Sequence, residues 1–478
     1  MLPHTVRPLR FAIGAALFLI ALASSSFAQT KSVLYSFDSS GIADGTEPTS
    51  ALVEDASGAL YGTTPLGGTG CSNRGCGVAF KLTPPADKGA PWTESILYNF
   101  GSRANDGTYP GQFASLTLDK NGNLYGTTSS GGTGNCNPNS ELGGCGTVFE
   151  LSPPEALGES WTENILYSFQ GVQGVAGTPL DGSDPQAGLV LDARGNLFGT
   201  TAYGGSGSQC TGNVGACGTV FELSPTAGGS WTEKIIHNFG NTSNDGANPY
   251  APLILVENEL LGTTLNGGSN YACGGSTDGC GLLFALIPPS TGGGKWMERT
   301  ASVGPLADGA TVFAGLVRGF DGKIYGVASQ GGSGQCQDDL QNTVGCGVVF
   351  QVTPPIASTQ WGPVEVIYNF TGGSDGGVPQ STLLTDKTGN LYGVAPAGGS
   401  CSGGYSFEDV SGCGTLFQLT PNSSGTTWSE KTIYQFQGGS TGATPWNIVP
   451  NRESGFFGVT SRGGSLTCNC GTVFEFKP

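Results

Sequence analysis

Apolar and polar residues alternate along many short stretches of this chain, and turn-forming residues separate the stretches. Residues 115–119 alternate as a half-buried β-strand does, and residues 124–128 form a returning strand after a tight turn of Asn and Gly. Residues 146–151 predict a third strand, which Pro153 ends because proline cannot donate a hydrogen bond to a sheet. Residues 161–169 alternate again. The pattern therefore predicts four consecutive antiparallel strands.

This four-strand unit recurs along the whole chain. Its second copy contains Gly-Asn-Leu-Tyr-Gly-Thr-Thr at 122–128, and six other segments match this core. The residues that precede the central glycine are separated by 63 to 73 residues: Tyr61, Tyr125, Phe198, Leu261, Tyr325, Tyr392 and Phe457. A fixed period predicts a repeat architecture. Seven repeats of four antiparallel strands predict an all-β fold, a seven-bladed β-propeller.

The two ends of the chain predict how the ring closes. Residues 32–37 match the fourth strand of a repeat, whereas residues 471–476 match the third strand of the last repeat. An N-terminal strand that completes the last blade would leave no open sheet edge. We therefore expect residues 29–478 to form a single propeller of roughly 65-residue repeats. An open solenoid of seven units is the alternative.

The first 28 residues have the pattern of a secretory signal peptide. Arg7 and Arg10 precede an apolar run at 11–23, and the small residues at 26–28 suit cleavage. An uncleaved N-terminal anchor is the alternative. We expect a secreted, extracellular or periplasmic protein without a membrane span after cleavage.

The composition excludes some partners. The chain has 19 Lys and Arg against 36 Asp and Glu, for a net charge of −17, and removal of the leader would make it more negative. Nucleic-acid binding depends on basic surfaces, so a nucleic-acid partner is not expected. An acidic chain permits cation or neutral-sugar binding without establishing either.

Several recurring motifs resemble one known family. They are the Gly-Asn-Leu-Tyr-Gly-Thr-Thr core, the Cys-Gly-Thr-Val-Phe-x-Leu strand and the Trp-Thr-Glu…Leu-Tyr-x-Phe strand. The whole mature chain is similar to the GloVer (Gloeo-Verruco) tandem-repeat proteins. The resemblance implies a bacterial surface or secreted protein without an established activity. Members often carry a C-terminal anchoring segment, and residues 476–478 do not resemble one.

The cysteines predict disulfides. Fourteen cysteines form one pair in each repeat: Cys71/Cys76, Cys136/Cys145, Cys210/Cys217, Cys273/Cys280, Cys336/Cys346, Cys401/Cys413 and Cys468/Cys470. In an exported protein such pairs read as disulfides, each closing the loop between the second and third strands. Zinc would need four convergent ligands, which one pair per repeat does not supply. The short spacer between Cys468 and Cys470 makes that pair the least favourable geometrically.

Histidine is nearly absent from the mature chain. His237 stands where other repeats carry Tyr98, Tyr167 and Tyr368, so we interpret it as a tyrosine substitute in a fourth strand. One histidine leaves little room for Ser-His-Asp hydrolysis, Cys-His proteolysis or a His-rich metal site. No catalytic residue is therefore assigned.

Recurring aspartates are the remaining chemical resource. Asp-Gly precedes the first strand of six repeats at Asp44, Asp106, Asp181, Asp245, Asp308 and Asp375. A turn explains this dipeptide, because Asp bonds its own backbone and Gly adopts positive φ. The sharper hypothesis places these residues around the central channel on the face that carries the cysteine loops. There they could bind a ligand, Ca²⁺, or a sugar to be cleaved.

Two further acidic series are assigned structural roles. Asp55, Asp119, Asp192, Asp321 and Asp386 precede the turn between the first two strands and belong to the opposite face. Glu94, Glu163, Glu233, Glu298 and Glu430 lie on the fourth strand, where we expect them to keep the outer edge soluble.

The sequence favours a binding or adhesion module over an enzyme. Repeats distribute similar groups evenly, whereas catalysis needs a local and unequal set. The expected ligand is a carbohydrate or a surface protein, the expected state is a monomer, and no cofactor other than Ca²⁺ is indicated. A polysaccharide-degrading enzyme and a structural surface-layer component are the alternatives.

Overall fold

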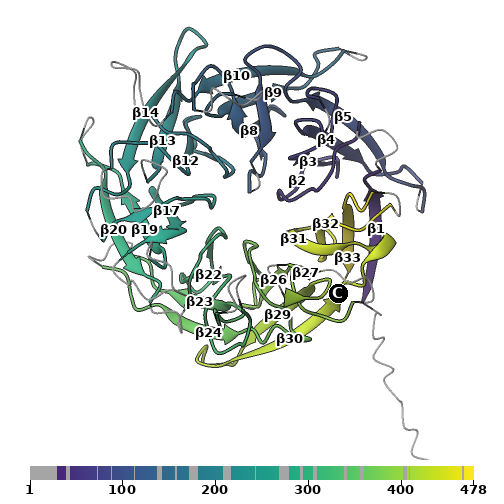
Figure 1. Cartoon of the computed structure of the whole chain (residues 1–478), viewed down its shortest axis with the longest axis vertical. Helices are drawn as coiled ribbons and strands as arrows, with labels where there is room; N and C mark the ends of the chain where they lie inside the picture. Colours follow the sequence, from purple (N-terminus) through teal and green to yellow (C-terminus); the bar gives the residue numbers. More distant parts are fainter. Residues whose placement is uncertain are drawn as a thin grey trace, which may run out of the picture.

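The computed structural model describes residues 29–477 apart from 39–42, 73, 88, 112, 137–142, 157–158, 172–180, 208–216, 243, 269–278, 291–293, 305–308, 338–341, 356–359, 402–405, 408–409 and 466–467. The predicted signal peptide lies outside the described residues. Within them, no helix is long and apolar enough to cross a membrane. Seven antiparallel sheets stand around a central axis, with their first strands toward the middle and their last strands on the rim (Figure 1).

Each blade contains four strands in sequence order. Blade 1 is formed by β2 (Val53–Glu54), β3 (Leu60–Thr64), β4 (Val78–Thr83) and β5 (Thr93–Asn99). Blade 2 is formed by β7 (Thr117–Leu118), β8 (Leu124–Gly131), β9 (Thr147–Ser152) and β10 (Thr162–Ser168), and β6 (Gly107–Pro110) also pairs with β8. Blade 3 is formed by β11 (Val190–Leu191), β12 (Leu197–Thr201), β13 (Thr219–Pro225) and β14 (Trp231–Asn238).

The remaining blades follow the same order. Blade 4 contains β16 (Ile254–Val256), β17 (Glu259–Thr264), β19 (Leu282–Ile287) and β20 (Met297–Ser302), with β15 (Gly246–Ala247) and β18 (Asn266–Gly267) paired beside it. Blade 5 contains β21 (Val317–Arg318), β22 (Ile324–Ala328), β23 (Val348–Val352) and β24 (Glu365–Asn369). Blade 6 contains β25 (Leu384–Thr385), β26 (Leu391–Ala395), β29 (Thr415–Pro421) and β30 (Trp428–Gln435), with a hairpin of β27 (Ser406–Phe407) and β28 (Val410–Ser411). Blade 7 contains β31 (Ala443–Pro450), β32 (Phe456–Arg462) and β33 (Thr472–Lys477), preceded by a 3-10 turn, η2 (Gly439–Thr441).

The N-terminal strand closes the ring as predicted. Strand β1 (Thr30–Ser36) pairs antiparallel with β33, from Thr30 opposite Lys477 to Ser36 opposite Thr472. Figure 1 shows β1 on the rim beside β33 and next to blade 1. The seven-bladed propeller is therefore confirmed, and the open solenoid is not the fold.

A phenylalanine pair joins neighbouring blades at six of the seven junctions. Phe169, which follows the fourth strand of blade 2, packs edge to face on Phe221 of the third strand of blade 3, with ring centroids 5.1 Å apart. The same contact recurs as Phe37–Phe80, Phe100–Phe149, Phe239–Phe284, Phe370–Phe417 and Phe436–Phe474. The ring also explains the glycine of the repeated core: a Cβ on Gly126 would lie 2.5 Å from Phe149. These aromatic contacts are buried and form the core between blades.

A backbone hydrogen bond ties every pair of neighbouring blades. In each repeat the third residue after the Asp position has a positive φ, between 50° and 64°, and its N–H donates to the carbonyl of the second cysteine of the preceding blade. Asp184, for example, donates to Cys145 at 2.9 Å. The next residue, Pro185, lies against Gly146, where a Cβ would come within 2.5 Å of the proline ring. The Cys-Gly motif is thus a docking point for the next blade.

Disulfides are formed within the repeats as predicted. Five pairs are described, at Cys71–Cys76, Cys136–Cys145, Cys336–Cys346, Cys401–Cys413 and Cys468–Cys470. Cys217 and Cys280 are also disulfide-bonded, whereas Cys210 and Cys273 lie outside the described residues. Among the described cysteines none is free. Each disulfide closes a loop beside the carbonyl that receives the next blade.

Candidate functional site: blade junctions and the channel mouth

The described Asp-Gly aspartates lie between the outer strands of neighbouring blades, where four are buried and Asp44 is partly buried. Asp181 is fully buried, and its carboxylate accepts a hydrogen bond from the Tyr167 hydroxyl at 2.6 Å. The backbone N–H groups of Gln170 and Gly171 also donate to it, at 2.9 and 3.2 Å. Tyr167 belongs to β10, the rim strand of blade 2. The carboxylate therefore links the rim of one blade to the first loop of the next.

The same arrangement recurs at three other junctions. Tyrosine hydroxyls of rim strands donate to Asp44 (3.0 Å), Asp106 (2.8 Å) and Asp375 (2.9 Å). Asp308 lies outside the described residues. The structure thus places the described members of this series against the rim strands, and not on the channel wall where the sequence hypothesis put them. Ligand binding by these residues remains a prediction.

The glutamates of the fourth strands are not exposed on the outer edge of the blades, where we expected them to keep that edge soluble. They point into the junctions, and this expectation was wrong because the neighbouring blade covers them. Burial, and then the charge of Asp44, raise the pKa of Glu94 to about 7, against a hydrogen bond from Tyr35. Burial and the charge of Asp181 likewise raise the pKa of Glu233 to about 7. Glu163 has a fully buried side chain and pairs with Arg103.

One junction has replaced both carboxylates, and a second has replaced its glutamate. Between blades 6 and 7, Thr441 stands in the Asp position and Lys31 in the Glu position. The Lys31 ammonium donates to the Thr441 carbonyl and lies 5.0 Å from the centroid of the Phe474 ring, and burial lowers its pKa to about 8. Between blades 4 and 5, Val364 stands in the Glu position. It packs in one apolar cluster with Val303, which stands in the position of the recurring phenylalanine. The structural role of the junction is retained while its chemistry changes.

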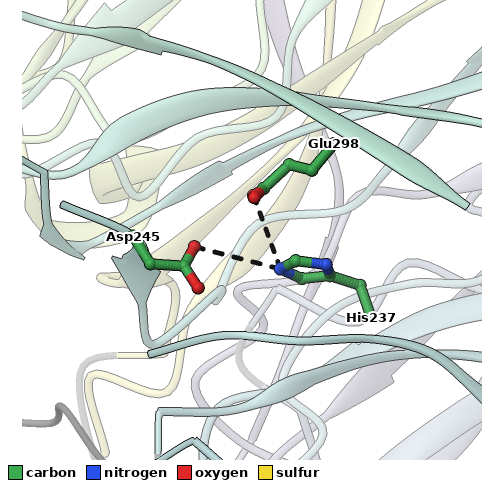
Figure 2. Close-up of side chains that lie close together, drawn as sticks. All are labelled: His237, Asp245 and Glu298. Atoms are coloured by element: carbon green, nitrogen blue, oxygen red, sulfur yellow. Dashed lines mark ion pairs between the residues drawn. The ribbon is translucent and has the colours of Figure 1, made fainter. Parts of the chain in front are cut away.

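The junction of blades 3 and 4 contains a third variant, with a histidine in place of the tyrosine. His237 lies on β14, Asp245 in the loop before β15 and Glu298 on β20, and the three side chains point toward one another (Figure 2). The His237 Nε2 atom is 3.4 Å from Glu298 Oε1 and 3.9 Å from Asp245 Oδ1. Burial raises the pKa of Glu298 to about 7, while His237 lowers it and Asp245 raises it. The prediction that His237 replaces a tyrosine in the fourth strand is confirmed by its pairing with Val220.

The second aspartate series forms turns. Asp119 Oδ1 accepts hydrogen bonds from the backbone N–H groups of Asn121 and Asn123, at 2.8 and 2.9 Å. Asp386 makes the same contacts with Thr388 and Asn390 at 2.8 and 3.0 Å. These bonds are those expected of Asp at the start of a tight turn.

Aromatic residues that are not part of the repeated motifs meet at the mouth of the central channel. Phe113 of blade 2 stacks on Phe313 of blade 5, with centroids 6.0 Å apart, and also contacts Trp446 of blade 7 at 5.8 Å. Tyr250 of blade 4 contacts Phe313 at 6.1 Å, and its hydroxyl lies 2.8 Å from that of Tyr203. Loops from distant blades thus meet across the channel. We call these five residues the channel-mouth cluster.

Polar groups and a cavity adjoin the channel-mouth cluster. Asp184 accepts a hydrogen bond from Gln186 at 2.8 Å, and burial raises the pKa of Asp184 to about 6. A cavity of about 210 Å³ extends along the first strands, with Phe113, Phe313, Gln380 and Asn447 in its wall. Ser183, in the loop before the first strand of blade 3, pairs with Tyr203, which follows the second strand and begins the cysteine loop. The mouth therefore lies on the same face as the cysteine loops.

Sequence reasoning missed the channel-mouth cluster. The residue after the recurring proline differs among repeats, with Gln186, Tyr250, Gln380 and Trp446 at this position. Attention to residues that vary inside an otherwise constant motif could have found it.

The fold and the junctions together define a repeat propeller in which neighbouring blades are joined by the same backbone hydrogen bond. Residues 16–208 and 139–407 match the model of the Gloeobacter/Verrucomicrobia repeat. The chain therefore belongs to this repeat family, as the sequence motifs indicated. No match was found among curated proteins.

Solved structures resemble the chain over most of its length. A Trichoderma reesei protein of carbohydrate-active enzyme family AA12 is 11% identical, with 95% of this chain and 96% of that chain covered and a TM-score of 0.41. The NanB sialidase of Streptococcus pneumoniae is 15% identical (93% and 70% covered, TM-score 0.40). The aldose sugar dehydrogenase of Streptomyces coelicolor is 10% identical (94% and 98% covered, TM-score 0.39). At these TM-scores the similarities carry no argument about function.

Proposed function

We propose that the protein is a secreted or periplasmic binding module that holds a neutral glycan at the mouth of its central channel. The channel-mouth cluster carries this proposal, because it is local and unequal where the rest of the ring is repeated. The disulfides favour an oxidising compartment. A surface protein is the other ligand class that such a cluster suits.

The chemistry of the mouth suits a sugar. Aromatic rings offer flat apolar faces to the C–H groups of a pyranose, and tyrosine hydroxyls and amides supply hydrogen-bond partners. Tyr203, Tyr250 and Phe313 are half-buried, and Gln186 lies beside Asp184. A net charge of −17 disfavours anionic ligands and leaves neutral glycans as the preferred class.

The number of carboxyl groups at the described part of the mouth favours binding over glycoside cleavage. Cleavage by the common mechanism uses two of them, about 5 to 9.5 Å apart on either side of the scissile bond. At the described part of the mouth, Asp184 is the carboxylate that contacts the cluster through Gln186. The junction aspartates face the rim and are engaged by tyrosine hydroxyls and backbone N–H groups.

A glycan array probed with the mature protein tests the proposal. Tyr250→Ala should abolish binding to the glycans that the unchanged protein retains, whereas Asp119→Asn, on the opposite face, should leave binding intact. Repeating the positive glycans with EDTA shows whether Ca²⁺ takes part. Binding that survives Tyr250→Ala, or that is lost with Asp119→Asn, would contradict the assignment. Shortened glycan products would make the protein an enzyme.

A further inference from the structure

We propose that His237, Asp245 and Glu298 form a binding site for a divalent transition-metal ion that bridges blades 3 and 4. The three residues offer one imidazole nitrogen and two carboxylates from three separate segments. Their candidate ligand atoms all lie within 4.8 Å of one another. In Figure 2 these atoms point to a common centre.

The geometry is close to what zinc requires. Zinc bonds to imidazole nitrogen and carboxylate oxygen are about 2.0–2.2 Å long, so neighbouring ligands of a tetrahedral site lie about 3.3 Å apart. His237 Nε2 and Glu298 Oε1 are 3.4 Å apart, and His237 Nε2 and Asp245 Oδ1 are 3.9 Å apart. A small rotation of the Asp245 carboxylate would complete the three-ligand set. Water would occupy the fourth position, because the site has three protein ligands.

Two buried atoms at this site have no hydrogen-bond partner. They are His237 Nε2 and Glu298 Oε1, which face each other at 3.4 Å without forming a hydrogen bond. Leaving a buried polar atom without a partner destabilises the fold, and an ion between the two would satisfy both. The Asp245 carboxylate accepts hydrogen bonds from the backbone N–H groups of Asn241 (3.0 Å) and Gly246 (2.8 Å), which keep it beside the other two residues.

Comparison with the sister junctions separates a metal site from the structural network. Tyr98, Tyr167 and Tyr368 occupy the position of His237 in other blades, and each donates its hydroxyl to the local aspartate. At those junctions the tyrosine hydroxyl therefore donates a hydrogen bond to the carboxylate. Imidazole instead supplies a nitrogen ligand, which suits transition-metal ions such as Zn²⁺, whereas Ca²⁺ is bound by oxygen ligands. The histidine side chain is 13% exposed and that of Glu298 is 23% exposed, so an ion can reach the site.

Zinc titration of untagged mature protein, dialysed first against EDTA, tests the site. His237 is the one histidine after residue 28, which makes the assignment unambiguous. We expect one Zn²⁺ per chain by calorimetry, X-ray absorption with a single imidazole ligand, and a rise in Tm of about 3 °C at a hundredfold excess over the dissociation constant.

Three variants decide the assignment. His237→Tyr installs the residue of the sister junctions and should fold without binding zinc. Glu298→Gln removes a ligand whose Oε1 already lacks a partner, so it should lower affinity at least about tenfold without unfolding the chain. Glu430→Gln, at the junction of blades 5 and 6, is the matched control and should bind zinc as the unchanged protein does. No stoichiometric binding by the unchanged protein, or equal binding by His237→Tyr, would overturn the proposal.

Discussion

The loop before the first strand of each repeat contributes to both a blade junction and the channel mouth. Its contacts at the junctions recur along the ring, whereas its contacts at the mouth vary. In the loop before the first strand, the Asp position faces the rim strands, as Asp181 does. The residue five positions later faces the channel, as Tyr250 does. The outward contact between a rim tyrosine and the aspartate recurs at four junctions. The inward contacts differ at nearly every blade. The repeated contacts therefore hold the ring together, and the contacts that differ from blade to blade lie at the proposed ligand site.

The largest effect should follow from opening the ring. A chain that begins at Asp38 lacks β1 and Phe37, and so loses the pairing with β33 and the Phe37–Phe80 contact. We expect its Tm to fall by more than about 10 °C, because an unpaired edge and an unfilled core are both exposed. A chain that begins at Thr30 is the control. An unchanged Tm would mean that closure contributes nothing to stability.

Single aspartates should separate junctions from turns. Asp181→Ala leaves the Tyr167 hydroxyl and two backbone N–H groups without their acceptor in a fully buried site. We expect a loss of about 3 kcal/mol of unfolding free energy. Asp386→Ala affects a turn on the surface and should cost about 1 kcal/mol. Urea unfolding measures both, and equal losses would remove the distinction between the two series.

The propeller, its closure and the disulfides could all be predicted from the sequence, because each is a periodic pattern. The position of Phe37 relative to Phe100 already shows that residues 32–37 are a fourth strand. The orientation of Asp181 could not be predicted in this way, because a strand pattern says which face a residue occupies and not which neighbouring blade covers it. The contact of Phe113 with Phe313 joins blades 2 and 5, which are 200 residues apart in the chain, and no repeat pattern encodes it.

Stability should fall as the pH rises because the junction glutamates are protonated in the folded state. The pKa values of Glu94 and Glu233 are raised from 4.5 to about 7. Their contribution to stability is fully present below about pH 4.5, and it is lost as the pH rises to about 7, where the folded state must also ionise. We expect the Tm to decrease between these values.

Substitution of the two glutamates should flatten this pH dependence. Glu94→Gln combined with Glu233→Gln keeps both side chains neutral, so the Tm should vary less between about pH 4.5 and 7. Glu159→Gln changes an exposed residue and should leave the slope unchanged. A slope that persists in the double variant would place the proton uptake elsewhere.

The smallest effect on stability, and the sharpest test of the comparison, is expected at the channel mouth. Tyr203→Phe and Tyr250→Phe each remove one partner of a hydroxyl pair that lies 2.8 Å apart. Each should cost less than about 1 kcal/mol, and a double-mutant cycle should show a coupling of about 0.5–1 kcal/mol. Because the rings remain, glycan affinity should fall only about tenfold when the hydroxyls contact the sugar. A loss of stability as large as that of Asp181→Ala would show that the mouth, like the junctions, serves the fold.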